Sequence, residues 1–280
     1  MFDLDSLIQT ALKEDIGWGD ITTEACVPPD LQAVGAFIAK EPMVICGLFT
    51  LQRVFAAMDE RVKVMLHCQD GSMLLAGTMV AEVSGPARAI LTAERTSLNI
   101  LQRLSGIATR TREAVTQVEG TQARVCDTRK TTPGLRELEK YAVRIGGGSN
   151  HRMGLSDGVL IKDNHIAAAG SIAKAVDAAR KRIPHSIKIE VETATIDDVR
   201  QALSSGADII MFDNMDIPMM TEAVRLVNGR ALTEASGNMG DKPLREVAMT
   251  GVDLISIGAL THTVHAADIN LKLGSTPKAL

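Results

Sequence analysis

Aromatic side chains are scarce in this sequence, whose 280 residues include five Phe, one Trp and one Tyr. A protein that holds single-stranded nucleic acid by stacking the bases needs more rings than this. An excess of positive charge is also missing, because 30 Lys and Arg stand against 34 Asp and Glu, for a formal net charge of −4. Binding of nucleic acid by bulk electrostatic attraction is therefore excluded, and any phosphate site must be local.

Cysteines and long apolar runs are few as well. The four cysteines are far apart and form no C-x-x-C pair: Cys26, Cys46, Cys68 and Cys126. This spacing argues against a zinc site or a disulfide scaffold and favours a reducing compartment. No stretch approaches the ~18–20 apolar residues of a membrane span. The first 15 residues carry acids in place of the basic region of a signal peptide. We expect a cytoplasmic protein that binds neither membrane nor nucleic acid.

What the sequence does have is a large apolar content of 45%, enough to bury a sizeable core. The pattern of predicted helices and strands changes near residue 105. The earlier part predicts a short helix over Leu4–Glu14, three strands and, from Ala87, a long helix with one buried face. The three predicted strands are Gln32–Ala39, Val62–Cys68 and Met79–Ser84.

The later part alternates short β-rich runs with amphipathic segments, which is typical of βα units in a parallel sheet. The predicted strands are Ala123–Asp127, Val159–Lys162, Ile187–Glu192, Asp208–Asp213, Ala231–Ser236 and Asp253–Gly258. The predicted helices between them are Ile172–Arg182, Ile196–Ser204, Met219–Val227 and Leu244–Thr250. Six strands are too few for a complete eight-stranded barrel of ~250 residues. An incomplete α/β barrel therefore fits better than a doubly wound sheet.

Charged and glycine-rich segments follow nearly every one of these strands. In a parallel barrel the chemistry is done at the carboxyl ends of the strands, so these segments predict an active site on one rim. Five basic residues form a clamp for carboxylate or phosphate: Arg129, Lys130, His151, Arg152 and Lys162.

Acidic residues and glycines complete the predicted rim. Glu192 and Asp213 supply oxygen ligands suited to Mg²⁺ or to sugar hydroxyls. Ser236-Gly237 and Gly258 precede predicted helices and resemble a backbone phosphate site. Together these residues suit a substrate with carboxylates, a ribose-like polyol and phosphates.

Several residues also have plainer interpretations. The run from Gly146 to Asn150 lacks the P-loop pattern and is interpreted as a turn that brings His151 and Arg152 inward. Lys162 fits a Schiff-base lysine as well as an anion-binding one. Glu190 and Glu192 share one strand face, so at most one of them is expected at the ligand, with the other bound to a lysine such as Lys188.

The remaining histidines have no spacing typical of a metal site, and they are predicted to lie on the surface or to be satisfied within the fold: His67, His185, His262 and His265.

One long segment resembles the signature of a known family. Asp127–His165 reads DTRKTTPGLRELEKYAVRIGGGSNHRMGLSDGVLIKDNH, and it is similar to the signature of the quinolinate phosphoribosyltransferases. The resemblance extends over essentially the whole chain. It includes the segments EDIGWGDITTEA, LTAERTSLNILQRLSGIAT, IEVET, MFDNM, EASGNM and SIGALTHTVHAADINLKL.

The resemblance implies an α/β protein with an N-terminal α/β sandwich domain followed by an open, incomplete α/β barrel. We place the sandwich at residues 1–105, with a C-terminal helix at about 265–280 packing back on it, and the barrel at 106–264. The family works as a homodimer or as a larger assembly such as a hexamer of dimers. It uses Mg²⁺ to transfer the phosphoribosyl group of phosphoribosyl pyrophosphate to quinolinate, giving nicotinate mononucleotide, pyrophosphate and CO₂ in NAD biosynthesis.

Site residues also follow from the resemblance. Arg129 and Arg152 match quinolinate-binding positions, with His151 and Lys162 beside them. Arg95 matches an arginine that the neighbouring subunit supplies. Thr128 and Lys130 match the rest of the substrate loop, and Glu192 and Asp213 match the ribose and metal side, where they hold the ion directly or through pyrophosphate and water. The phosphate-binding segments match Ser236, Gly237, Asn238, Ser256, Ile257 and Gly258. Lys130, Lys162, Glu192 and Asp213 are the expected catalytic residues.

Two other functions compete. One is a related phosphoribosyltransferase of the same fold, either nicotinate-using or associated with molybdenum transport. Nicotinate has one carboxylate, so the full set Arg95, Arg129, Arg152 and Lys162 favours quinolinate. The other is a catalytically silent ligand sensor, against which the intact Lys130, Glu192 and Asp213 argue.

Overall fold

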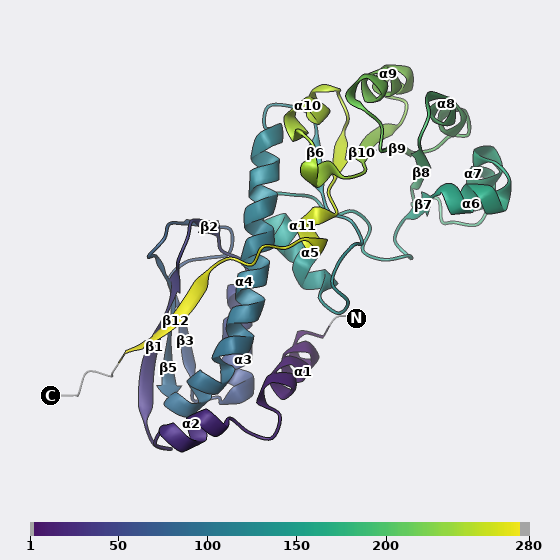
Figure 1. Cartoon of the computed structure of the whole chain (residues 1–280). Helices are drawn as coiled ribbons and strands as arrows, with labels where there is room; N and C mark the ends of the chain where they lie inside the picture. The colour runs from purple at the N-terminus through teal and green to yellow at the C-terminus, as the bar shows by residue number, and fades with distance from the viewer. Residues whose placement is uncertain (1–2, 275–280) are drawn as a thin grey trace. The chain divides into compact units, whose positions relative to one another are not determined.

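The computed structural model describes residues 3–274, which fall into two units (Figure 1). Within these residues, the first unit comprises 3–110, 137–146 and 264–274, and the second comprises 111–136 and 147–263. Helix α4 (Ala87–Val118) contributes residues to both units, and its start confirms the long helix predicted from Ala87. No helix among the described residues is both long and apolar enough to cross a membrane.

The first unit is built on an antiparallel sheet in the order β12-β1-β5-β3. These strands are β12 (Ile269–Gly274), β1 (Gln32–Ala39), β5 (Met79–Pro86) and β3 (Lys63–Leu66). The residues of β1 alternate between exposed or partly exposed and buried, as expected for a strand with one face on the core. Phe37 of β1 meets Phe55 in the core, with ring centroids 6.1 Å apart in an edge-to-face arrangement.

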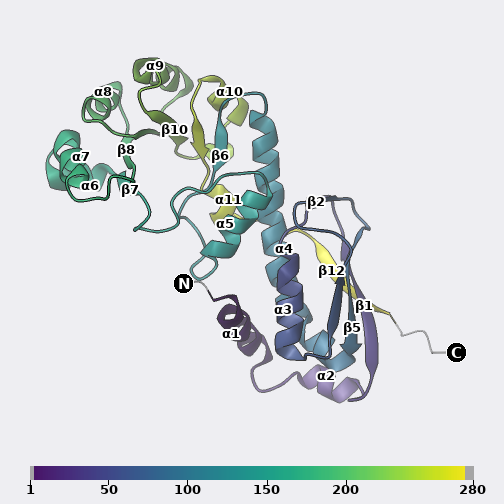
Figure 2. The ribbon, with the colours of Figure 1, turned by 180° about the vertical axis from the view of Figure 1, so that it is seen from behind.

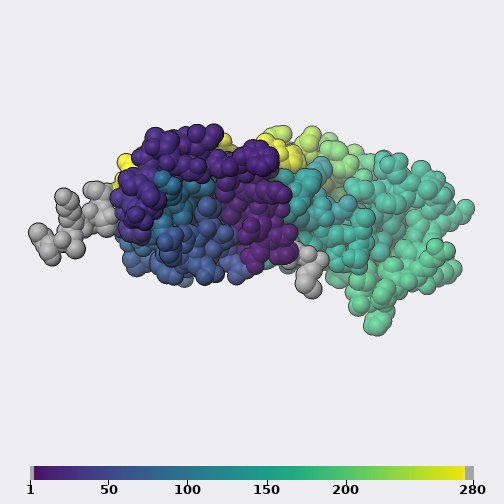
Figure 3. All heavy atoms as spheres, turned by 90° about the horizontal axis from the view of Figure 1, so that it is seen from below, coloured from purple at the N-terminus to yellow at the C-terminus, as the bar shows by residue number. Residues whose placement is uncertain are grey.

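Helices and a short ribbon complete this unit: α1 (Leu4–Ile16), α2 (Ile21–Cys26), β2 (Met43–Val44), α3 (Leu48–Met58), β4 (Met73–Leu74) and α5 (Arg136–Ile145). Asp3 and Asp20 cap the N-termini of α1 and α2 by accepting backbone N–H bonds. Figure 3 shows the purple residues of α1 and α2 at the surface of this unit, beside its blue residues.

The C-terminal segment corrects one prediction. Residues 269–274 form strand β12, which pairs antiparallel with β1, whereas a helix was predicted over about 265–280. The alternation Ile269, Leu271, Leu273 has the period of a strand, and the partly buried Leu271 packs against the core. The segment does pack on the first unit, as predicted. Residues 275–280 lie outside the described part of the chain.

The second unit contains a parallel sheet in the order β6-β11-β10-β9-β8-β7. The strands are β6 (Arg124–Cys126), β7 (Val159–Ile161), β8 (Ile189–Thr193), β9 (Ile209–Asp213), β10 (Leu232–Ser236) and β11 (Leu254–Ser256). All six were predicted to within two residues at each end. Since β6 and β7 are the two edges of this sheet order, the barrel is open and incomplete, as expected.

Helices follow the strands of this unit and lie along the outside of the sheet (Figures 1 and 2). They are α6 (Asp163–Ala169), α7 (Ile172–Arg180), α8 (Ile196–Ser204), α9 (Ile217–Val227), α10 (Leu244–Met249) and α11 (Ala259–His262), with a 3₁₀ turn η1 (Met239–Asp241). Side chains of Ser171, Thr195 and Asp216 accept backbone N–H bonds at the starts of α7, α8 and α9. The caps of α8 and α9 fix the points at which the loops after β8 and β9 end, and the cavity described below lies at that edge of the sheet.

Candidate active site

A cavity of about 790 Å³ lies at the carboxyl ends of the parallel strands. This is the rim on which the sequence predicted an active site. The predicted residues that line it are Thr128, Arg129, Lys130, His151, Arg152, Lys162, Glu192, Asp213, Ser236, Gly237, Asn238, Ser256 and Gly258. Ile257 is instead buried, and its backbone N–H donates to the Cys126 carbonyl at 2.9 Å. Arg95 is an exposed residue of α4 in the first unit, and its predicted role in a shared site stays a prediction.

The loop after β6 presents Thr128, Arg129 and Lys130 to the cavity. The Lys130 backbone N–H donates to the Thr128 hydroxyl at 3.0 Å, and the Thr261 hydroxyl donates to the Lys130 carbonyl at 2.8 Å. Both backbone groups of Lys130 are thus held within the unit. Its side chain lies over Gly258, where an added Cβ would come within 3.0 Å of the Lys130 Cδ. Gly258 therefore makes room for the lysine.

Asp127 fixes the segment that carries His151 and Arg152. This fully buried carboxylate accepts bonds from the Asn150 side chain and from the His151 backbone N–H, the latter at 2.9 Å. Ser149 pairs with Cys126 and thereby extends the edge of the sheet. The glycine run is therefore followed by an anchored segment, and the predicted inward placement of His151 and Arg152 is confirmed by their position in the cavity wall.

Arg129 and Arg152 give one part of the cavity its positive charge. The Nε of Arg129 is buried and has no hydrogen-bond partner among the described residues. Burial lowers the pKa of Arg152, and the nearby charge of Arg129 lowers it further. Two guanidinium groups held close together and partly out of water are electrostatically unfavourable until an anion joins them. This part of the cavity is therefore suited to a carboxylate-rich ligand.

Lys162 and the acidic residues lie farther along the strand ends. The Lys162 Nζ is 2.7 Å from the Glu192 Oε2, and the Lys162 side chain, which lines the cavity, remains about half exposed. An ion-paired ammonium is not a free amine nucleophile, so the anion-binding interpretation of Lys162 is favoured over the Schiff-base one. Asp213 ends β9, and its Oδ2 accepts a bond of 2.9 Å from the Asn214 side chain.

The turn after β10 has a backbone geometry that residues other than glycine rarely adopt. Gly237 has φ +93°, and an added Cβ there would lie 2.2 Å from the Asn214 Oδ1 and 2.8 Å from the Asn214 backbone nitrogen. Asn238 is also left-handed, with φ +50°, and it precedes η1. The turn after β10 can thus approach a ligand closely, as the predicted phosphate site requires.

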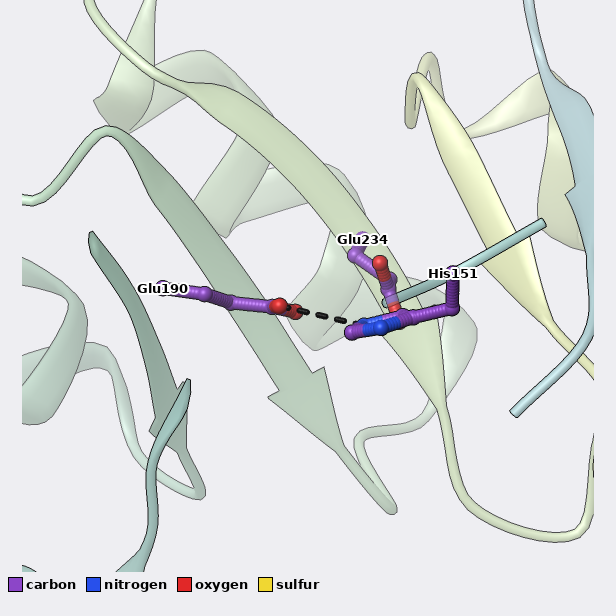
Figure 4. A group of neighbouring side chains, drawn as sticks. All are labelled: His151, Glu190 and Glu234. Carbon is purple, nitrogen blue, oxygen red and sulfur yellow. Dashed lines mark ion pairs between the residues drawn. The ribbon is translucent and has the colours of Figure 1, made fainter. Parts of the chain in front are cut away.

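The partly buried His151 and the buried Glu190 and Glu234 form a cluster beside strands β8 and β10 (Figure 4). The His151 Nε2 lies 3.1 Å from the Glu190 Oε2 and 3.7 Å from the Glu234 Oε1. Its Nδ1 accepts the Arg152 backbone N–H at 2.7 Å. Glu190 was predicted to bind a lysine such as Lys188, and this is corrected: its partner is His151, because Glu190 faces the interior whereas Lys188 is exposed before β8 begins.

Sequence reasoning missed two features of this site. Glu234 lies within the predicted strand Ala231–Ser236 and was given no role, although an acidic residue in the middle of a strand of a buried parallel sheet is itself a signal of a special environment. His262 was predicted to be an ordinary surface or satisfied histidine, but it lines the cavity from α11. The signal available for His262 was its position just after the last strand of the rim.

Comparisons with known proteins agree with this geometry. A family profile described as "Quinolinate phosphoribosyl transferase, C-terminal domain" matches residues 107–272, and the profile of the N-terminal domain of the same family matches residues 20–105. A Bacillus subtilis protein named "Probable nicotinate-nucleotide pyrophosphorylase [carboxylating]" is 47% identical over 268 residues, which cover 96% of this chain and 92% of that protein.

A chloroplastic nicotinate-nucleotide pyrophosphorylase (carboxylating) of Arabidopsis thaliana is 43% identical over 97% of this chain and 83% of its own length. Among solved structures, NadC from Streptococcus pyogenes superposes with a TM-score of 0.93 at 41% identity, covering 98% of this chain and 97% of that one. Both profiles together span nearly all described residues, and the relatives are similar over nearly their whole length. The chain belongs to the quinolinate phosphoribosyltransferase family.

Proposed function

We propose that this protein transfers the phosphoribosyl group of phosphoribosyl pyrophosphate to quinolinate with loss of CO₂, giving nicotinate mononucleotide for NAD biosynthesis. The relatives named above carry this activity in their names. The observation that supports it best is the buried, unpartnered Nε of Arg129 beside Arg152 in the cavity wall.

Quinolinate is a pyridine with two adjacent carboxylates. Arg129 and Arg152 can each bind a carboxylate through two parallel N–H bonds, and they lie in one part of the cavity. Lys162 adds a point charge on the same rim, steadied by Glu192 at 2.7 Å. A dianionic ring would relieve the repulsion between the two guanidinium groups, which a ligand with one carboxylate would do less completely.

Phosphoribosyl pyrophosphate fits the other side of the cavity. The left-handed turn at Gly237 and Asn238 lines the cavity together with Gly258 and Lys130, and this combination of backbone and positive charge suits phosphate groups. Transfer of the ribosyl group develops positive charge on the sugar and negative charge on the leaving pyrophosphate. The carboxylates of Glu192 and Asp213 can stabilise the positive charge on the sugar, and the Lys130 ammonium group can stabilise the negative charge on the pyrophosphate.

Mg²⁺ is the cofactor that this reaction calls for. Glu192 and Asp213 supply hard carboxylate oxygens to the same cavity, as a Mg²⁺ site requires, so the donor set fits the ion. They would hold it directly or through pyrophosphate and water. When bound, Mg²⁺ neutralises charge on the leaving pyrophosphate.

The direct test is the purified protein with quinolinate, phosphoribosyl pyrophosphate and Mg²⁺. We expect pyrophosphate and CO₂ in equal amounts, with no pyrophosphate when a chelator removes the metal or when nicotinate replaces quinolinate. Turnover of nicotinate alone would identify the related nicotinate-using enzyme instead. Tight quinolinate binding without any turnover would identify a ligand sensor.

A shared active site in a homodimer is part of the same proposal, with Arg95 as the residue supplied by the partner subunit. Arg95 is exposed on α4, as such a role requires. An Arg95→Ala chain and an Arg152→Ala chain should each be inactive alone. Mixed under conditions in which subunits exchange, they should regain up to about a quarter of the wild-type rate, because hybrid dimers contain one intact site. A mixture that exchanges subunits and stays inactive would contradict the shared site.

A further inference from the structure

In the cluster of His151, Glu190 and Glu234, His151 belongs to the predicted anion clamp, whereas the two buried carboxyl groups have been given no part in binding either substrate. Glu234 of β10 is 1% exposed and Glu190 of β8 is 4% exposed. The Oε1 atoms of both are buried with no hydrogen-bond partner among the described residues. Leaving carboxylate oxygens unsatisfied in a protein interior is costly, so the arrangement calls for an explanation.

A proton on Glu234 relieves much of this cost. Burial raises the pKa of Glu234 to about 7, and the adjacent Glu190 charge also raises it, while His151 and the Ser256 hydroxyl act in the opposite direction. The groups that face Glu234 are thus Glu190 from β8, His151 from the anchored loop and Ser256 from β11. Near neutral pH this carboxyl group can both hold a proton and release one.

A second cavity, of about 450 Å³, reaches the same cluster from the other end of the strands. Its wall includes the first residues of several strands and the exposed Ser186 and Lys188. His151, Arg152 and Glu234 line both this cavity and the larger one, while Glu190 lines only the second. Glu234 therefore contacts the substrate cavity and a separate route toward solvent.

The proposed reaction consumes a proton at a defined atom. When the carbon–carbon bond to the departing carboxylate breaks, CO₂ leaves without the bonding electrons. The electron pair stays on the ring carbon beside the cationic, ribosylated nitrogen. Nicotinate mononucleotide carries hydrogen at that carbon, so a carbon–hydrogen bond must form there. The proton donor for this step should be shielded from water in the substrate cavity, because that water would compete at the ribosyl centre. It should also be able to take up a new proton after each turnover.

We propose that Glu234 is the general acid that protonates the ring carbon after CO₂ leaves, and that it is recharged from the second cavity. This inference rests on the proposed function. The Glu234 O–H bond breaks as the carbon–hydrogen bond forms, and the resulting carboxylate lies beside the His151 Nε2. His151 is a positioning residue: with its Nδ1 accepting the Arg152 N–H, its Nε2 carries the hydrogen that faces both carboxyl groups. A proton taken up from bulk solvent and passed on by water in the second cavity then re-forms the Glu234 O–H bond, so each turnover takes up one proton.

A divalent cation is the alternative occupant, since one ligand atom from each of the three residues lies within 4.8 Å of the others. The proton explains the cluster better, because Arg152 borders it and interacts with the Glu190 charge. A cation bound there would have a guanidinium group as its neighbour.

The test separates the two halves of the reaction in a single turnover, with quinolinate, phosphoribosyl pyrophosphate and Mg²⁺, quenched on the millisecond scale. Pyrophosphate reports ribosyl transfer, and nicotinate mononucleotide reports decarboxylation and protonation. We expect Glu234→Gln, which keeps the size of the side chain, to slow the first step by less than about threefold. It should slow the second by about 100-fold, the lower range of general-acid catalysis, and accumulate the ribosylated dicarboxylate. Glu246→Gln, the same change on exposed α10, is the control and should behave as wild type.

The wild-type protein provides a second readout that needs no variant. Its second step should slow by about tenfold per pH unit above pH ~7, because a donor is lost as it deprotonates, and Glu234→Gln should lack this dependence. A second step that is independent of pH from 6 to 8, or a variant that slows both steps equally, would overturn the proposal. So would one equivalent of transition metal bound by wild type and lost in Glu234→Gln. A wild-type protein that releases no pyrophosphate would overturn the proposed function itself, a distinct result.

Discussion

The two units differ in how they treat polar groups that are removed from water. In the first, the buried Glu139 accepts two bonds from Arg103, at 2.9 and 2.6 Å. The Asp70 Oδ1 accepts the Gly47 and Leu48 N–H groups at 3.0 Å each and so caps α3, while its Oδ2 accepts the Tyr141 hydroxyl at 2.7 Å. These contacts satisfy polar groups within the unit and hold helices in place.

In the second unit, three side chains with unsatisfied buried atoms gather around the cavities: Arg129, Glu190 and Glu234. The first unit has one such atom among the described residues, the Oδ1 of Asn270 on the outer strand β12. Polar groups satisfied by the protein stabilise the fold, whereas those left without partners mark where a ligand or a proton completes the structure. Substitutions should therefore separate stability from function according to the unit.

The largest expected effect on stability is in the first unit. Glu139→Ala removes the buried partner of Arg103, whose side chain is only 30% exposed. The change removes a buried carboxylate together with its ion pair and hydrogen bonds to Arg103, and we expect the free energy of unfolding to fall by about 3–5 kcal/mol in urea titrations. Asp5→Ala breaks the exposed pair with Arg53 and serves as the control, with an expected loss below about 1 kcal/mol. Equal losses in the two variants would remove the contrast between buried and exposed pairs.

A substitution of a charged residue in the second unit, Arg129→Ala, should weaken substrate binding and leave the free energy of unfolding almost unchanged. Arg129→Ala is expected to weaken quinolinate binding by about 2–5 kcal/mol in calorimetry, because one carboxylate would be left in the cavity without its partner. Binding of phosphoribosyl pyrophosphate should change much less. Since the Nε of Arg129 is unsatisfied in the free protein, we expect no loss of unfolding free energy. Equal weakening of both substrates would instead place Arg129 on the phosphate side.

The sequence predicted the elements that depend on local patterns of residues, and it failed where a conformation depends on contacts between residues far apart in the chain. The strands of the second unit were predicted because each combines a short apolar run with a polar end, as in Ile209–Asp213. Strand β12 was not predicted: its period-two alternation is short, and the segment is held as a strand by pairing with β1, more than 200 residues earlier in the chain. The cluster of Glu190, Glu234 and His151 was missed for the same reason: three separate segments bring these residues together, and nothing local marks their contact.

An intermediate effect is expected at the turn after β10. Gly237→Ala introduces a methyl group where φ is +93° and where Asn214 atoms lie 2.2 to 2.8 Å from the new Cβ. The turn must move, at a cost of about 1–3 kcal/mol in strain, and its distance from the phosphates changes. We expect a higher KM for phosphoribosyl pyrophosphate with quinolinate affinity nearly unchanged, measured by initial rates. Gly229→Ala is the control: it has a similar positive φ of +72°, but no atom lies near its added Cβ. A KM change in both variants would indicate backbone strain rather than the turn itself.

The smallest change tests a single hydrogen bond of the first unit. Tyr141→Phe removes the hydroxyl that donates to the Asp70 Oδ2 and keeps the ring against Phe49, with centroids 5.4 Å apart. Asp70 keeps its two bonds to the start of α3, so only one of three is lost. A hydrogen bond to a charged acceptor contributes about 1.5–3 kcal/mol, and solvent reaching the part-buried Asp70 should reduce the loss in unfolding free energy to about 1 kcal/mol.

Asp70→Asn with Tyr141→Phe completes a double-mutant cycle, and the coupling energy should account for most of that loss. The affinities for quinolinate and phosphoribosyl pyrophosphate should stay at wild-type values in both variants. A change in either affinity without a change in stability would contradict the assignment of this network to the fold alone.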